Sequence, residues 1–235
     1  MSKHVLTDVV LFAFLACSLA LAHQPTVSDE SAVDAENAIE FENVQISRVV
    51  YHEMSEQAPR LWLTFEVHQP QALLLQLGVP FIDGLEDYRP TLALLGPGLP
   101  EVEVPFATPS GLGGIVFDTR DVADPEVFHE PFSGTTSWII TETEVELPQA
   151  GRCYVVAYHP SEEPGKLWVA LGWEEVFELD DLLELPDVLG QVRDFHELPQ
   201  GAAPPCFLVP LAAGLTGFWL LRRVGGGLPA RARDR

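Results

Sequence analysis

The residues of this sequence best suited to metal chemistry are its histidines, and His23 stands out among them. It follows Ala20-Leu21-Ala22, whose small residues fit the cleavage site of a secretory signal peptide, so cleavage there would make His23 the mature N-terminus. An N-terminal histidine offers its amine and its imidazole to one ion, and Cu(II) favours nitrogen ligands. The candidates for a further imidazole are His52, His68, His129 and His159. The alternative is that His23 merely marks the cleavage point.

Three aspartates suggest a second kind of metal site. Asp118, Asp121 and Asp124 follow one another at three-residue steps, which resembles a loop that presents oxygen ligands to calcium. The full signature of a calcium loop is missing, so solvated turns are the alternative interpretation. Copper and calcium are therefore the two cofactors that the sequence suggests.

Two tryptophans, Trp62 and Trp168, are candidates for stacking against a sugar ring. Such a pair would make the chain a carbohydrate-binding module. Large aromatic residues in β-domains also fill cores and cover edges, and this alternative stays open beside the glycan-binding role.

Common catalytic motifs are incomplete in this sequence. His52-Glu53-Met54-Ser55-Glu56 begins like a zinc-protease helix but lacks the second histidine. A nucleophile elbow of the Gly-x-Ser-x-Gly type is missing, and the glycine run at 111–114 lacks the lysine of a phosphate loop. A non-catalytic module is therefore favoured over an enzyme, although a site assembled from scattered residues stays open.

The charge distribution bounds the partners of the chain. Residues 23–203 carry 33 acidic and 7 basic residues, a balance of −26, whereas residues 222–235 carry 5 arginines and 1 aspartate. So negative a domain repels phosphate backbones, which excludes nucleic acid as a partner, and leaves cationic or polar ligands open. A solvated, soluble surface is the alternative explanation of the acid excess.

The two ends of the chain predict its location. An apolar run over residues 9–21 follows Lys3, as in a signal peptide. Residues 204–221 contain no charged side chain and are followed by Arg222-Arg223, which predicts one transmembrane helix with its basic end in the cytoplasm. The alternative is a helical hairpin in a soluble core. We expect a single-pass protein of the cell membrane with its main domain outside the cytoplasm.

The predicted organisation has six segments along the chain. They are a signal peptide (1–22), a flexible acidic lead (23–37), a β-sandwich ectodomain (38–177), an amphipathic helix with a juxtamembrane linker (178–203), a transmembrane helix (204–221) and a basic cytoplasmic tail (222–235). The three cysteines fall in different segments, so no disulfide is expected within the domain, and Cys153 is interpreted as a buried apolar filler.

Short segments of alternating polarity dominate the ectodomain. Clear alternation over 61–67, 142–147, 152–159 and 166–171 predicts strands, and 148–151 predicts the turn of a hairpin between two of them. Weaker strand candidates are 39–47, 73–79, 91–95, 102–106 and 114–118. Many short strands without intervening helices indicate an antiparallel β-sandwich, either jelly-roll or immunoglobulin-like.

One helical segment is predicted late in the chain. Apolar residues recur at three- and four-residue steps from Leu182 to Phe195, Asp180 or Asp181 can cap the start, and Pro186 should kink or restart the helix. This amphipathic helix would end near Glu197 and pack on the sandwich or lie near the membrane.

Several motifs resemble those of a known group of proteins. They are Ala22-His23-Gln24-Pro25, Glu130-Pro131-Phe132, Leu147-Pro148-Gln149-Ala150-Gly151 and Gly165-Lys166-Leu167-Trp168-Val169-Ala170-Leu171-Gly172. The group comprises uncharacterised prokaryotic secreted proteins, for which a β-sandwich and a C-terminal membrane helix are expected. Residues 145–172 are also similar to the jelly-roll of bacterial pre-peptidase C-terminal domains. Neither resemblance transfers a catalytic residue.

The leading functional expectation is a membrane-tethered, extracytoplasmic binding or accessory module. The alternatives are a surface protein that binds copper or calcium, a carbohydrate-binding module and an enzyme without a familiar motif.

Overall fold

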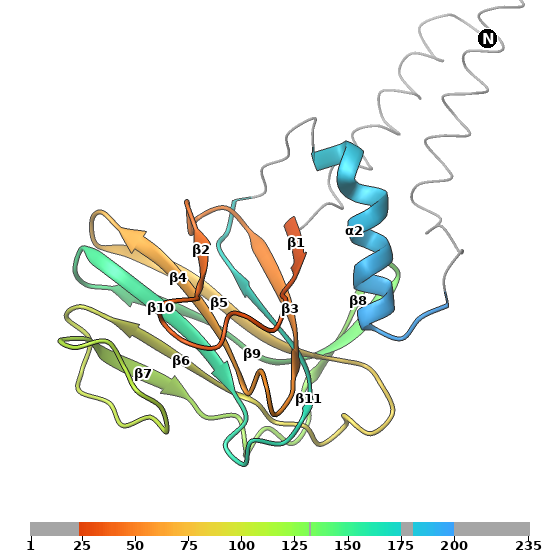
Figure 1. The fold of residues 1–235 in the computed structure, drawn as a ribbon, viewed down its shortest axis with the longest axis horizontal. Helices are drawn as coiled ribbons and strands as arrows, with labels where there is room; N and C mark the ends of the chain where they lie inside the picture. Colours follow the sequence, from red (N-terminus) through yellow and green to blue (C-terminus); the bar gives the residue numbers. More distant parts are fainter. Residues whose placement is uncertain (1–23, 132, 175–180, 200–235) are drawn as a thin grey trace, which may run out of the picture. The chain divides into compact units, whose positions relative to one another are not determined.

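Two β-sheets and one helix make up the part of the chain that the structure describes, residues 24–131, 133–174 and 181–199 (Figure 1). In this computed structural model the six-stranded sheet has the order β1-β3-β11-β5-β9-β8, and the five-stranded sheet has the order β2-β4-β10-β6-β7. The strands of the first sheet are Gln24–Val27 (β1), Arg48–Met54 (β3), Gly165–Leu171 (β11), Gln71–Pro80 (β5), Thr135–Leu147 (β9) and Glu126–Glu130 (β8). Those of the second are Ile39–Phe41 (β2), Arg60–Val67 (β4), Gly151–Tyr158 (β10), Thr91–Gly96 (β6) and Gly113–Phe117 (β7). The prediction of a mainly β domain is confirmed.

Both sheets are mixed, which corrects the expectation of antiparallel sheets. β1 pairs in parallel with β3, and β2 pairs in parallel with β4. The other strand pairs in the described residues are antiparallel. The parallel pairs arise because the strand that lies between the two partners in the sequence belongs to the other sheet. Such a crossover leaves no local signal in the sequence.

The N-terminal segment, expected to be a flexible lead, is part of the fold. Residues 24–27 form β1, and Ala32 is fully buried. The sequence patterns also miss β3 and β8, because neither has a clean alternation of polar and apolar residues. Conversely, residues 102–106 form no strand. They belong to a loop, residues 97–112, that packs against the outer face of the five-stranded sheet.

The predicted hairpin around residues 148–151 is wrong. β9 and β10 belong to different sheets, so this turn carries the chain from one sheet to the other. The next connection, from β10 to β11, carries it back. The alternation of polar and apolar residues determines which face of a strand is buried, but it does not say which sheet the strand joins.

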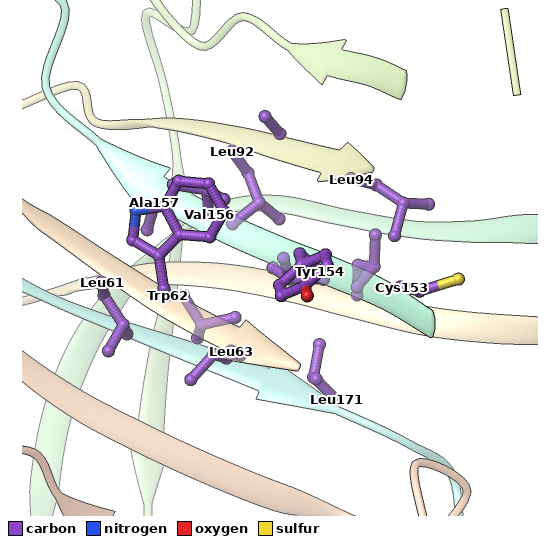
Figure 2. Close-up of a cluster of buried hydrophobic side chains, with 14 of the residues drawn as sticks. Leu61, Trp62, Leu63, Leu92, Leu94, Cys153, Tyr154, Val156, Ala157 and Leu171 are labelled. Carbon is purple, nitrogen blue, oxygen red and sulfur yellow. The ribbon is translucent and has the colours of Figure 1, made fainter. Parts of the chain in front are cut away.

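One hydrophobic core is shared by the two sheets. Residues of both sheets form a single buried cluster, which includes Leu61, Leu63 and Val155 of the five-stranded sheet and Leu75 and Val169 of the six-stranded sheet. Figure 2 shows part of this cluster, with Leu61 and Leu63 on β4, Leu92 and Leu94 on β6, and Leu171 on β11. The apolar faces of the two sheets therefore bury one another.

The outer face of the five-stranded sheet is covered by the loop of residues 97–112. Trp62 of β4 lies beneath it and contacts Phe106 and Tyr154 edge to face, with ring centroids 5.3 and 5.8 Å apart. Trp62 is 2% exposed, so burial of its ring stabilises this layer by about 2–3 kcal/mol. Its Nε1 has no hydrogen-bond partner among the described residues.

The predicted late helix is confirmed as α2, Asp181–Phe195, and it continues through Pro186 as one helix rather than restarting there. Val192 and Phe195 pack on Tyr51 and Trp168, on the outer face of the six-stranded sheet. The helix ends where Glu197 takes a positive φ of 58°, with the Leu198 amide donating to the Arg193 carbonyl at 2.9 Å.

The predicted membrane and targeting segments lie outside the described residues. These are the signal peptide (1–22), His23, the transmembrane helix (204–221) and the basic tail (222–235). Within residues 24–131, 133–174 and 181–199, no helix has the length and apolar character needed to cross a membrane.

Candidate functional site

A concavity of about 300 Å³ lies on the outer face of the six-stranded sheet, and we call it the acidic concavity. Its lining comes from β3, β11, β5, β9 and β8, and consists of Val49, Tyr51, Gln76, Glu126, Phe128, Glu130, Thr135, Ser137, Ile139, Glu142 and Trp168. The site is therefore assembled from strands that are far apart in the sequence.

The floor of the acidic concavity is aromatic and held by hydrogen bonds. Trp168 Nε1 donates to Ser137 Oγ at 3.0 Å, which fixes the indole across the sheet. Ser137 Oγ in turn lies 3.2 Å from Nε2 of His196, a residue that follows α2. This short chain of bonds ties β11, β9 and the end of α2 together.

The protonation state of His196 follows from its surroundings. Its Nδ1 lies 2.8 Å from the Val192 carbonyl and donates to it, so Nε2 is the acceptor for the Ser137 hydroxyl. Burial, assisted by the positive charge of Lys166, lowers the pKa of His196 to about 4. The imidazole is therefore neutral near pH 7.

A serine hydrogen-bonded to a histidine, as Ser137 is to His196, can serve as a nucleophile and its general base in an enzyme. The Ser137 hydroxyl already accepts the Trp168 N–H, and both members of the pair are buried, at 5% exposure each. The geometry thus supports a structural role, in which the pair anchors α2 on the sheet. Lys166 Nζ adds to the anchor by donating to the Phe195 carbonyl at 3.1 Å.

Three glutamates give the concavity its charge. Glu126 and Glu130 come from β8, and Glu142 comes from β9, where Gln76 Nε2 donates to its carboxylate at 2.6 Å. Among the described residues that line it, none is a lysine or an arginine. Burial, and secondarily the charge of Glu130, raises the pKa of Tyr51, so its hydroxyl stays protonated. Carboxylates beside aromatic rings suit an organic cation.

His52, the first of the predicted copper ligands in the described chain, is buried and already bonded. Its Nδ1 lies 2.6 Å from Ser28 Oγ, and its Nε2 lies 3.2 Å from the Ala58 carbonyl. Burial lowers the pKa of His52. Its ring therefore holds the N-terminal segment and a turn in place.

The other predicted histidine ligands are spread over the fold. His129 Nδ1 lies 2.9 Å from Thr136 Oγ1, His159 stacks on Tyr88 at 4.8 Å, and His68 is exposed after β4. Within the described residues, no group of three or more His, Cys, Asp or Glu side chains is placed to hold a metal ion. Copper binding through His23 stays a prediction.

The three predicted calcium ligands follow β7. Arg120 Nε donates to the carboxylate of Asp118 at 3.0 Å, and this side-chain hydrogen bonding lowers the pKa of Asp118 to about 2. Asp121 and Asp124 are exposed in the same loop. Calcium binding there also stays a prediction.

The two tryptophans predicted to stack on a sugar are not brought together. Trp62 lies on the five-stranded sheet and Trp168 on the six-stranded sheet, and they are 2% and 6% exposed. They therefore form no common exposed platform, and Trp168 instead contributes to the floor of the acidic concavity.

Sequence reasoning missed the glutamates of β8 and the Ser137–His196 pair. Residues 126–130, Glu-Val-Phe-His-Glu, show no clean alternation of polar and apolar side chains, and β8 has no buried face, so a period of two could not be recognised there. Ser137 and His196 lie 59 residues apart, and no local pattern joins them.

No protein-family model matches this chain, and no curated protein matches it. Among solved structures, the chain is similar to the pre-peptidase C-terminal domain of collagenase from Bacillus anthracis, with 8% identity over 57% of this chain and 93% of that one. The TM-score is 0.32, and a likeness this weak carries no argument about function. It agrees with the similarity to pre-peptidase C-terminal domains noted for residues 145–172 only at the level of a β-rich fold.

Proposed function

We propose that this chain is an extracytoplasmic binding module, tethered by its predicted membrane helix, and that the acidic concavity binds cationic groups. The observation that supports this proposal is the placement of three carboxylates around an aromatic floor. An alkylammonium or guanidinium group there would meet the negative charge of the glutamates and the ring of Phe128, which is 37% exposed.

The strength of such a site can be bounded. A cation–π contact at a partly exposed site contributes about 1 kcal/mol, and each exposed carboxylate contributes about 0.2–1 kcal/mol. Together these terms give about 1.6–4 kcal/mol, which corresponds to a Kd of roughly 1 to 70 mM. An isolated cationic group therefore binds weakly and in a salt-dependent way.

The test is a titration of the full-length protein with arginine amide, in which calorimetry measures the heat of binding. Citrulline amide is the control ligand, because it has nearly the same shape and the same α-ammonium group but lacks the guanidinium charge. We expect arginine amide to bind with a Kd of roughly 1 to 70 mM and citrulline amide to bind at least about fivefold more weakly. Equal binding of the two amides contradicts the proposal.

A pair of variants locates the site. Glu126→Gln removes a carboxylate from the rim, whereas Glu146→Gln removes an exposed carboxylate of β9 that does not line the concavity. We expect the first to weaken arginine amide binding about threefold and the second to leave it unchanged. Equal effects would mean that only the overall negative charge attracts the ligand.

A further inference from the structure

In the part of the chain that the structure describes, β8 is an edge strand of the six-stranded sheet. Within the described residues it pairs with β9 on one side and has no neighbour on the other. Its residues 126–129 are exposed, including Val127 at 45% and Phe128 at 37%. An uncovered edge strand with apolar side chains is a template for pairing with another chain.

The register shows which backbone groups of β8 face the open edge. The Phe81 amide donates to the Thr136 carbonyl at 2.9 Å, so the backbone N–H and C=O of Thr136 point towards the β5 side of β9. The backbone N–H and C=O of the next residue, Ser137, therefore point towards β8, where Ser137 is paired with Phe128. Because backbone direction alternates along a strand, Val127 and His129 present their N–H and C=O groups to the open edge.

The two faces of β8 differ in character. Glu126, Phe128 and Glu130 line the acidic concavity on one face. On the other face, Val127 is paired with Trp138, on whose ring Phe81 packs at 4.3 Å. Phe81 is 51% exposed, so this second face is apolar around Val127, while His129 on the same face is held by Thr136 Oγ1, 2.9 Å from its Nδ1.

We propose that the partner of this edge is an extended peptide of alternating basic and apolar residues, which adds as a strand to β8. This proposal rests on the proposed function, since the basic side chains would enter the acidic concavity. An added strand lies about 4.8 Å from β8, which brings its side chains beside those of both faces. Main-chain hydrogen bonds then supply the affinity that a single cationic group lacks.

A second copy of this chain is a poorer occupant of the same edge. Antiparallel pairing of two β8 strands about Phe128 would place Glu126 of each copy opposite Glu130 of the other. Like charges directly opposite one another destabilise a strand pair. The charge of β8 therefore favours a basic partner.

The first experiment measures fluorescence anisotropy of a labelled peptide of roughly six residues, alternating lysine and valine, with the full-length protein. We expect the peptide to bind at least about tenfold more tightly than lysine amide. Val127→Pro removes one edge N–H without removing a bond to β9, and should reduce peptide affinity by about tenfold while lysine amide binding is unchanged. Val127→Thr, which keeps the N–H, is the matched control.

A second experiment leaves the protein unchanged. The peptide is N-methylated on alternate residues in either of two registers, and only the register whose N–H groups face β8 should lose binding. Equal loss in both registers, or a peptide no tighter than lysine amide, overturns the strand-addition proposal. Failure of lysine amide and arginine amide to bind at all overturns the proposed function instead. A dimer that Val127→Pro dissociates, together with absence of peptide binding, would identify a second copy as the occupant and also overturn the proposal.

Discussion

Gly78 of β5 lies directly against the indole of Trp168 on β11, its partner in the sheet register. A β-carbon at position 78 would lie only 2.1 Å from Cε2 of Trp168. Because glycine has no side chain, the indole lies across β5, and its Nε1 donates to Ser137 on β9. The floor of the acidic concavity therefore depends on a glycine that does not line it.

Replacing Gly78 by alanine should destabilise the domain by about 2–4 kcal/mol. The methyl group displaces the Trp168 ring, and the hydrogen bond to Ser137 is lost with it. Urea unfolding followed by tryptophan fluorescence measures the change. A free energy of unfolding equal to that of the wild type would show that the ring does not occupy the position described.

Replacing Gly190 by alanine should instead increase the free energy of unfolding. Gly190 lies inside α2, and a β-carbon there would meet no atom within 4 Å outside the helix's own backbone. Alanine in a helix interior is favoured over glycine by roughly 0.5–1 kcal/mol. The same urea titration checks this gain, and a loss of stability would mean that the site is more crowded than the structure shows.

The stability of the domain should fall as the pH drops below the ordinary pKa of histidine. Burial lowers the pKa of His196 to about 4 in the folded state, whereas the unfolded chain protonates near 6.5. The contribution of His196 to the free energy of unfolding is therefore fully present above pH 6.5 and is lost as the pH falls towards 4. The total loss is on the order of 3 kcal/mol. Unfolding free energies measured between about pH 7 and 5 test this slope.

His196→Gln is the control for that pH dependence. Glutamine cannot titrate, yet its amide can still donate to the Val192 carbonyl or accept from the Ser137 hydroxyl. The slope of stability between about pH 6.5 and 5 should be smaller in this variant. An unchanged slope would assign the pH dependence to other groups, such as the buried His52.

Cys153 should resist alkylation in the native protein. It is 1% exposed, and burial, with a smaller effect from the charge of Glu66, raises the pKa of its thiol to about 11. Mass mapping after iodoacetamide treatment at about pH 8 should find modification at Cys153 only when urea is present. Equal labelling without urea would contradict the buried position.

The burial pattern of the clearest strands follows from local sequence alone. Leu61, Leu63 and Phe65 alternate with polar or bulky neighbours, and all three lie in the core, as the period of two predicts. The apolar steps that end at Phe195 likewise predicted α2, whose Val192 and Phe195 are buried. These features are local, because side-chain direction repeats along a strand or a helix whatever its partners are.

The identity of neighbouring strands, and of the residues that share the site, depends instead on tertiary packing. β9 and β10 follow one another in the chain but join different sheets, whereas Ser137, Trp168 and His196 are distant in sequence and hydrogen-bonded in space. Pairing depends on how whole faces pack against one another, which no short window of sequence contains. The acidic concavity and the open edge of β8 are products of that packing.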